Sequence, residues 1–237
     1  MCTASWLIHA DGYELFFNRD ESVQRGTARP PERLELGGVR VLAPRDADAG
    51  GTWLGVNEHG LGLALLNAWD AREGLAGARS RGLLVQGLLD ARDGAAALAR
   101  LAQEDLARYR GFTLALFEPG RAPRARAWDG RALAALEPRA PLCSSSLDRG
   151  RAQAERERVW GRLLADQPGP SRALHERFHA SHEPERGPWS PCMHRADAAT
   201  VSASQVRVDA RAVALRYADG PPCTAAFGPW LALERAG

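Results

Sequence analysis

Short apolar and aromatic runs separated by glycine and asparagine fill the first third of the chain and predict β-strands. Asp11-Gly12, between the first two runs, is a strong signal for a two-residue hairpin turn. Glu58-His59-Gly60 fits a three-residue loop whose glycine adopts the left-handed conformation. We therefore expect two antiparallel hairpins, with strands over 5–10, 13–18, 53–57 and 61–67.

The middle of the chain departs from this pattern. Glycine and proline are frequent between positions 26 and 51, which predicts a surface loop that shapes the entrance of a pocket. From Arg81 onward, leucines recur at helical spacing. A second helix rich in alanine and leucine follows Asp93-Gly94 and is expected to continue to about Tyr109.

Strand and helix patterns alternate in blocks over the rest of the chain. Strands are predicted over 112–117 and 125–128, helices over 151–164 and 173–179, and a final hairpin over 200–217 that turns near Asp209-Ala210. Blocks of strands followed by blocks of helices favour an α+β fold with helices on antiparallel sheets over a parallel βαβ fold.

Composition narrows the class of protein. At 237 residues the chain is long enough for one sizeable core, and we expect a single domain over 1–237. The sequence contains no lysine, and its 31 basic residues are balanced by 29 acidic ones along the whole length, for a net charge of +2. Without a basic stripe, the expected partner is a small molecule, and neither nucleic acid nor stable membrane insertion is expected.

The cysteines and the first ten residues indicate the cellular location to expect. Widely spaced Cys2, Cys143, Cys192 and Cys223 form no Cys-x-x-Cys motif and are predicted to be reduced. The segment 1–10 has no basic start and no long apolar stretch, so we expect no signal peptide and no transmembrane span. A cytoplasmic location follows as the expectation.

The second residue carries the main chemical hypothesis. Removal of Met1 makes Cys2 the N-terminus, where one residue supplies a thiol nucleophile and an amine that can act as its base. A charged tetrapeptide, Asn18-Arg19-Asp20-Glu21, follows the apolar pair Phe16-Phe17. By itself such a tetrapeptide is most often a solvated turn with an internal ion pair, so the hypothesis depends on other motifs as well.

Together with Cys2 and the tetrapeptide, the segments 50–56, 66–67 and 80–82 resemble the NRDE family, whose members are similar to transport and Golgi organisation protein 2. The resemblance covers about the first 90 residues strongly. It implies a relation to N-terminal nucleophile (Ntn) hydrolases of the cholylglycine hydrolase and penicillin V acylase type, and thus a four-layer αββα sandwich.

The resemblance also implies roles for individual residues. Arg19 would lie near the Cys2 thiol and favour its thiolate, and Asp20 or Glu21 would orient the α-ammonium. Asn67 would donate its side-chain amide to a developing oxyanion, an effect typically worth about 3 kcal/mol of the barrier. The sequence departs from the pattern of these hydrolases at two positions. Ser22 occupies the position of an aspartate, and Ser144 occupies the position of a second asparagine that donates to the oxyanion.

The function expected from these residues is attack on an amide or thioester through an acyl-cysteine intermediate, with no cofactor. The alternative is a non-catalytic carrier of haem, lipid or acyl-CoA, which the family resemblance also implies. Cys192 and His194 would then be axial haem ligands. An apolar pocket for such a ligand would be lined by four tryptophans, at positions 53, 69, 189 and 230.

Three histidines raise the question of a metal. His175, His179 and His182 are spaced so that a helix would place them along one face, a geometry that can bind zinc. Pro184 ends the helix almost at once, and no acidic residue is placed to orient the imidazoles. We therefore predict a polar helix face and no metal site.

Overall fold

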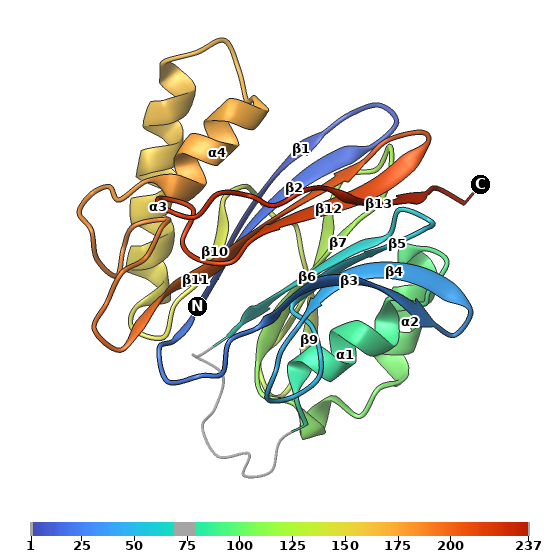
Figure 1. Cartoon of the computed structure of the whole chain (residues 1–237). Coiled ribbons are helices and arrows are strands. Elements are labelled where there is room, and N and C mark those ends of the chain that lie inside the picture. The colour runs from blue at the N-terminus through green and yellow to red at the C-terminus, as the bar shows by residue number, and fades with distance from the viewer. Residues whose placement is uncertain (1, 69–78, 237) are drawn as a thin grey trace.

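Two antiparallel sheets face each other, and a pair of helices covers the outer side of each (Figure 1). The computed structural model describes residues 2–68 and 79–236. The layer order is helices, sheet, sheet, helices, so the four-layer α+β sandwich predicted from the sequence is confirmed.

The first sheet has the strand order β10-β1-β2-β11-β12-β13. Both hairpins expected within it are present, and the first turns at Ala10-Asp11, one residue before the predicted pair, where the His9 amide donates to the Gly12 carbonyl at 2.9 Å. The start of the chain thus lies inside a sheet, between β10 and β2. The strands are β1 (Cys2–Ile8), β2 (Tyr13–Ser22), β10 (Leu142–Ser144), β11 (Ala198–Val208), β12 (Ala212–Ala218) and β13 (Leu231–Glu234).

The second sheet has the strand order β3-β4-β5-β6-β7-β8-β9. Its β5–β6 hairpin turns as predicted, with Gly60 at φ +82°. The strands are β3 (Arg29–Leu36), β4 (Val39–Arg45), β5 (Leu54–Asn57), β6 (Gly62–Asn67), β7 (Phe112–Phe117), β8 (Arg124–Trp128) and β9 (Leu133–Leu136).

The prediction of a surface loop over 26–51 was wrong for most of that segment, because it contains the β3–β4 hairpin. Gly37 and Gly38, at φ +58° and +83°, form the tight turn that matches the twist of the flanking strands. Pro30 and Pro31 are tolerated since β3 is an edge strand, where a missing amide donor breaks no ladder.

The helices begin at residues whose side chains cap them. Ser80, Asp93, Asp148 and Ser171 each accept a hydrogen bond from a backbone amide in the first turn. The second predicted helix ends earlier than expected and is followed by a short 3-10 helix, η1 (Leu106–Arg108). The helices are α1 (Arg81–Leu88), α2 (Gly94–Gln103), α3 (Arg149–Ala165) and α4 (Arg172–Ala180).

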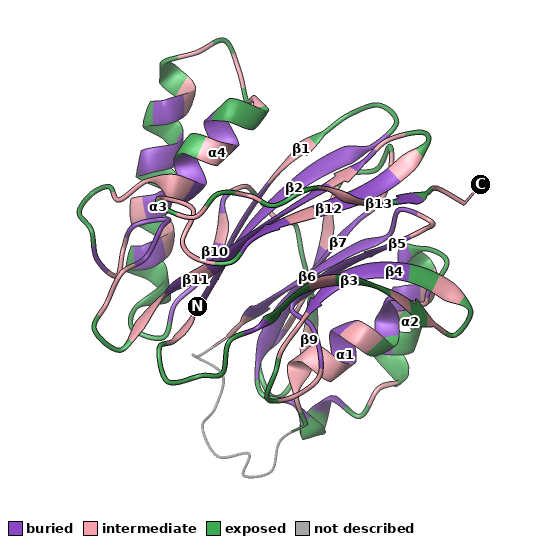
Figure 2. Cartoon of the chain, viewed as in Figure 1, coloured by how far each residue is buried: buried purple, intermediate pink, exposed green. Residues whose placement is uncertain are grey.

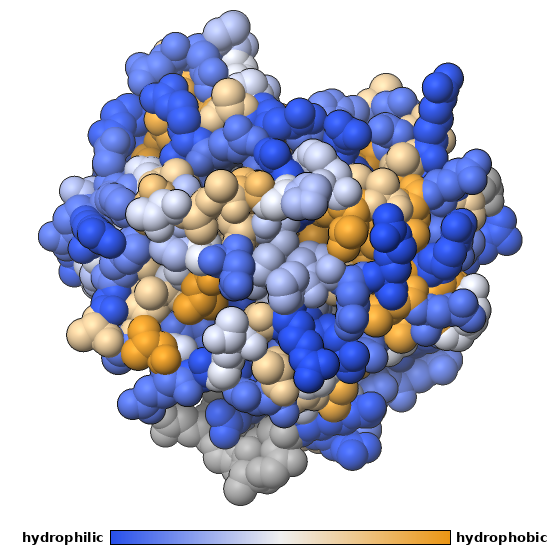
Figure 3. All heavy atoms as spheres, viewed as in Figure 1, coloured by the Kyte–Doolittle hydropathy of each residue, from blue (hydrophilic) through white to orange (hydrophobic). Residues whose placement is uncertain are grey.

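Apolar residues are buried in three clusters: between the sheets, between the second sheet and α1 and α2, and between α3 and α4 (Figure 2). The visible surface is mostly hydrophilic, with one larger apolar area at the right of the view and smaller ones elsewhere (Figure 3). None of the helices in the described ranges is both long and apolar enough to cross a membrane. Cys2 is 6% exposed and belongs to the cluster between the sheets, so the start of β1 lies in the hydrophobic core of the protein.

Candidate active site at the start of the first strand

Strand pairing brings three of the predicted site residues side by side. Cys2 lies directly opposite Arg19 of β2 on one side and Ser144 of β10 on the other. Directly opposed residues in antiparallel strands have Cβ atoms about 5 Å apart and share a face of the sheet. The hairpin and β10 therefore gather these side chains around the first residue of β1.

A cavity of about 350 Å³ opens at this end of the two sheets. Strand β1 packs against β6 of the facing sheet, which brings Asn67, at the end of β6, to the cavity that Cys2 borders. The cavity thus joins five of the six predicted catalytic residues. These five, all of which line the cavity, are Cys2, Arg19, Asp20, Glu21 and Asn67.

Arg19 is held in place from several sides. Its Nη2 lies 2.9 Å from Asp46 Oδ2 and 3.4 Å from Glu21 Oε2, and its guanidinium stacks on Trp53 at 4.3 Å from the ring centroid. Arg25 shares the Asp46 carboxylate, at 2.9 Å. Sequence analysis missed Asp46 and Arg25, since only the folded chain brings the residues after β2 and β4 together.

Asp20 and Glu21 have different surroundings because side chains alternate along β2. Glu21 contacts Arg19, whereas the Asp20 side chain is fully buried on the side of α3. Thr200 Oγ1 donates to Asp20 Oδ1 at 2.6 Å, and Arg156 Nη2 lies 3.5 Å from Oδ2. Burial raises the pKa of Asp20, an effect that Arg156 opposes.

The Thr200 hydroxyl also accepts a hydrogen bond from the Met193 amide at 2.8 Å. A single oxygen therefore connects Asp20 to the backbone of the segment that precedes β11. Neither Thr200 nor Arg156 was among the predicted residues, because both lie far from Asp20 in the sequence.

Burial has the largest effect on the pKa of the Cys2 thiol. Burial raises its pKa to about 11, and the nearby Arg19 lowers it by less than burial raises it. The role predicted for Arg19 at the thiolate stays a prediction, because desolvation is the largest influence on this thiol and the N-terminal amine opposes it more than Arg19 does. Nucleophilic attack by Cys2 consequently requires a base that removes the thiol proton during the reaction.

Ser144 does not border the cavity in the way the resemblance implied. It lies beside Cys2 in the sheet, but its hydroxyl is buried, and no described residue forms a hydrogen bond with it. Because a donor must point at the position of the oxyanion, Asn67 is the better placed of the two predicted donors.

The three histidines of the predicted helix face do not form one group in the structure. Ser5 Oγ lies 2.6 Å from His175 Nδ1 and 2.9 Å from His179 Nε2, and His175 stacks on Phe16. These two imidazoles form part of the packing between α4 and the first sheet. His182 follows the end of α4 at Ala180 and lies with Cys192, Cys223 and His194 instead.

The predicted tryptophan pocket is divided among separate places. Trp53 stacks on Arg19 in the cavity, Trp189 contacts Arg151, and Trp230 contacts Arg216. The fourth tryptophan, at position 69, lies outside the described residues.

The fold defines the class of protein. The chain is similar to a mutant of the conjugated bile acid hydrolase from Clostridium perfringens, with 13% identity, a TM-score of 0.53, and 99% of this chain and 92% of that one covered. It is also similar to the Caenorhabditis elegans ortholog of N-acylethanolamine-hydrolyzing acid amidase, with 10% identity, a TM-score of 0.58, and coverage of 86% and 92%. These similarities establish the Ntn-hydrolase fold.

The sequence identifies the family within this class. The model of the Transport and Golgi organisation 2 family matches residues 1–131, more than half of the chain, and the chain belongs to that family. Among curated protein sequences, no significant match is found. The family resemblance noted from Cys2 and the charged tetrapeptide is thereby confirmed.

Proposed function

We propose that the protein is an Ntn-type hydrolase or acyltransferase that cleaves an amide or thioester with Cys2 as nucleophile. The supporting observation is that Cys2, Arg19, Glu21 and Asn67 border one cavity at the start of β1. Both structural neighbours are named as enzymes that hydrolyse their substrates, and they have the same fold. The proposal requires removal of Met1, which frees the Cys2 amine.

The proposed reaction has two displacement steps, acylation of Cys2 and then deacylation. The Cys2 amine, with a reference pKa of about 7.7 to 8.0, takes the thiol proton as sulfur bonds to the substrate carbonyl carbon. The carbonyl electron pair moves to oxygen, where the Asn67 amide donates a hydrogen bond. When this intermediate collapses, the leaving amine or thiol departs with the proton held by the ammonium. Water or an amine then attacks the acyl-cysteine in the same manner and regenerates the thiol.

The cavity lining favours a substrate that carries negative charge. Its described residues include five arginines, at positions 19, 25, 79, 81 and 110, against three carboxylates, at positions 20, 21 and 46. Asp46 pairs with Arg19 and Arg25, and Glu104, which is outside the lining, pairs with Arg79. The arginines of the lining still outnumber its carboxylates. An acyl compound with a carboxylate or phosphate group matches this lining.

The decisive experiment compares wild type with Cys2→Ala on a panel of amides and thioesters. Intact mass first establishes whether Met1 is absent, and a reagent that condenses only with N-terminal cysteine should add once. We expect Cys2→Ala to abolish turnover and the acyl-enzyme mass. Cys143→Ser is the matched control, because Cys143 lies on the neighbouring strand and its thiol bonds to Gln153. Retained Met1, or full turnover in Cys2→Ala, would refute the mechanism.

The second candidate is a carrier of lipid or haem. A separate cavity of about 500 Å³ lies between α4, β2 and the β12–β13 connection. Its lining combines three phenylalanines with charged side chains such as Arg177 and Arg216, a size and character that suit a ligand with an apolar body and an acidic group. Neither Cys192 nor His194 borders it. Tight binding of a fatty acyl probe or haem, retained in Cys2→Ala, is the expected result for a carrier. A haem spectrum identical to that of free haem would argue against haem as its ligand.

A further inference from the structure

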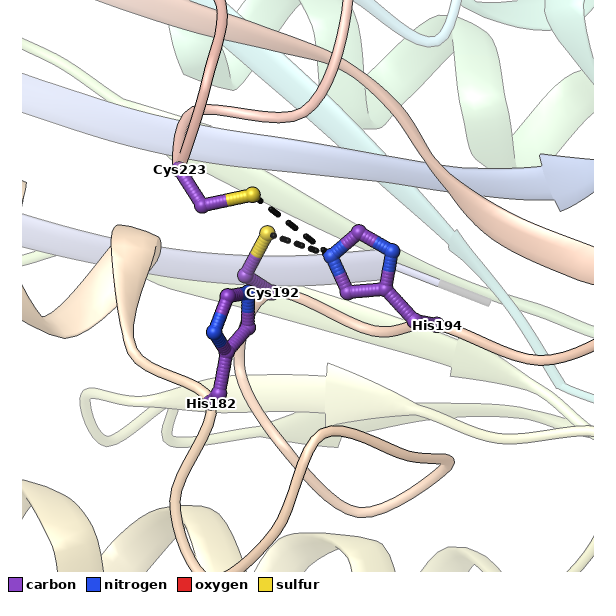
Figure 4. A group of neighbouring side chains, drawn as sticks. All are labelled: His182, Cys192, His194 and Cys223. Carbon is purple, nitrogen blue, oxygen red and sulfur yellow. Dashed lines mark hydrogen bonds between the residues drawn. The ribbon is translucent and has the colours of Figure 1, made fainter.

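Four potential metal ligands from three separate segments converge beside the first sheet (Figure 4). His182 follows α4, Cys192 and His194 precede β11, and Cys223 lies in the connection between β12 and β13. One ligand atom from each lies within 4.8 Å of the ligand atoms of the other three. We call this set the Cys₂His₂ cluster.

The distances within the cluster match those around a small ion. His194 Nε2 lies 3.5 Å from Cys192 Sγ and 3.6 Å from Cys223 Sγ. Tetrahedral zinc with bonds of about 2.3 Å to sulfur and 2.0 to 2.1 Å to nitrogen separates its sulfur and nitrogen ligands by about 3.5 Å. The imidazoles of His182 and His194 are 5.0 Å apart at an angle of 70°, so both can point toward a common centre without stacking.

Two polar groups of the cluster are withdrawn from solvent. Cys192 is fully buried, and the Nε2 atom of His182 is buried without a hydrogen-bond partner among the described residues. An unsatisfied buried polar atom costs about 1 to 3 kcal/mol, and native structures contain few of them.

The backbone holds the cluster in shape. The Cys192 amide donates to the Ser181 carbonyl at 3.0 Å, and the His194 amide donates to Gly187 at 3.2 Å. Ser190 Oγ donates to the Cys192 carbonyl at 2.7 Å. These bonds fix the segment between α4 and β11 around the ligands, so binding an ion requires little rearrangement.

We propose that the Cys₂His₂ cluster is a structural zinc site. Its four protein ligands complete a tetrahedral shell with no position left for substrate, the arrangement typical of structural and not catalytic zinc. Binding releases one proton from each thiol, and the two thiolates neutralise the charge of Zn²⁺. Two thiolates and two imidazoles favour zinc over magnesium or calcium, which prefer oxygen ligands. The ion would link α4, the segment before β11 and the β12–β13 connection.

The first test is performed on the wild-type chain, purified without an affinity tag that binds metal. Elemental analysis should find about one zinc per chain. Replacement of zinc by Co²⁺ should give the strong visible bands of tetrahedral cobalt together with sulfur-to-cobalt charge transfer. A metal-free protein that binds neither ion, or a Cys192–Cys223 disulfide in freshly purified protein kept from air, would overturn the proposal.

The second test uses matched variants. Cys223→Ser changes a partly exposed loop residue of the cluster, and Cys143→Ser makes the same change in a cysteine outside it. We expect zinc content to fall at least tenfold in Cys223→Ser and to stay unchanged in Cys143→Ser. Circular dichroism establishes that both variants are folded. If Cys223→Ser is unfolded, cobalt spectra of His182→Gln, which should lose the tetrahedral bands, take its place. Equal zinc content in both cysteine variants would contradict the assignment.

Discussion

At the scale of single residues, the buried imidazoles beneath α4 make stability depend on pH. Burial lowers the pKa of His175 to about 4, whereas in the unfolded chain it is about 6.5. Between these values the unfolded chain binds a proton that the folded chain does not, so stability falls as the pH drops through this window. The loss attributable to His175 is about 3 kcal/mol at pH 4, relative to pH 7.

This prediction is checked by urea unfolding of wild type and His175→Gln between pH 7 and pH 4. Glutamine retains a hydrogen bond to Ser5 but does not titrate. We expect the free energy of unfolding of His175→Gln to decline less steeply than that of wild type. Parallel curves would show that His175 does not carry the dependence.

The site residues that sequence could predict are those whose chemistry is local. Cys2 and Arg19 were predictable because a short hairpin forces them opposite each other. Asp46 and Arg156 were not, since each reaches the site from a distant element that the pattern of the first strands does not specify. Asp20 was expected at the amine, and its contacts with Arg156 and Thr200 became visible only once α3 and β11 were placed.

At the scale of elements, one substitution should have opposite effects in a turn and in a helix. Gly38, at φ +83°, has no atom within 4 Å of where a Cβ would lie, so Gly38→Ala tests the backbone alone and should destabilise by about 1 kcal/mol. Gly161, inside α3 and equally open, should gain about 1 kcal/mol in Gly161→Ala. Chemical denaturation measures both. A gain in Gly38→Ala would mean that the β3–β4 turn differs from the one described.

The same hairpin explains why one element escaped prediction. Glycine and proline usually mark loops, and segment 26–51 is rich in both. Prolines at an edge and two glycines in a turn are nevertheless compatible with strands, and only the sheet order shows that β3 is an edge strand. The apolar hairpins and the helices of the described ranges had stronger periodicity, and their predicted positions agree with the structure to within a few residues, except for the end of α2.

At the scale of the whole molecule, the arginine-rich cavity should affect which substrates react and under what salt. On the proposed function, kcat/KM for an anionic thioester should fall several-fold as ionic strength rises, because salt screens the attraction between charges. An uncharged thioester should be little affected. Arg110→Gln should lower the rate for the anionic substrate, and Arg158→Gln, on the exposed side of α3, should not. Equal salt dependence for both substrates would contradict the prediction.

The layer order of the molecule could be predicted from the alternating blocks of strands and helices, whereas the Cys₂His₂ cluster could not. Its spacings along the chain, from His182 to Cys192, to His194 and to Cys223, follow no common zinc motif. The local patterns divide the ligands between two hypotheses: Cys192 and His194 as haem ligands, and His182 on a helix face with His175 and His179. Cys223, the fourth ligand, lies near the other three only because the first sheet positions the β12–β13 connection beside them.

The Thr200 hydroxyl connects the two proposed sites. It donates to Asp20, the neighbour of Arg19, and accepts from the amide of Met193, which lies between two residues of the cluster. Coupling between two binding events is thermodynamically reciprocal, so any change that zinc imposes on the strand beside Cys2 has an equal counterpart in the affinity for zinc when the cavity is filled. Zinc affinity measured with the cavity empty and filled would therefore report on this coupling without a label in the cavity.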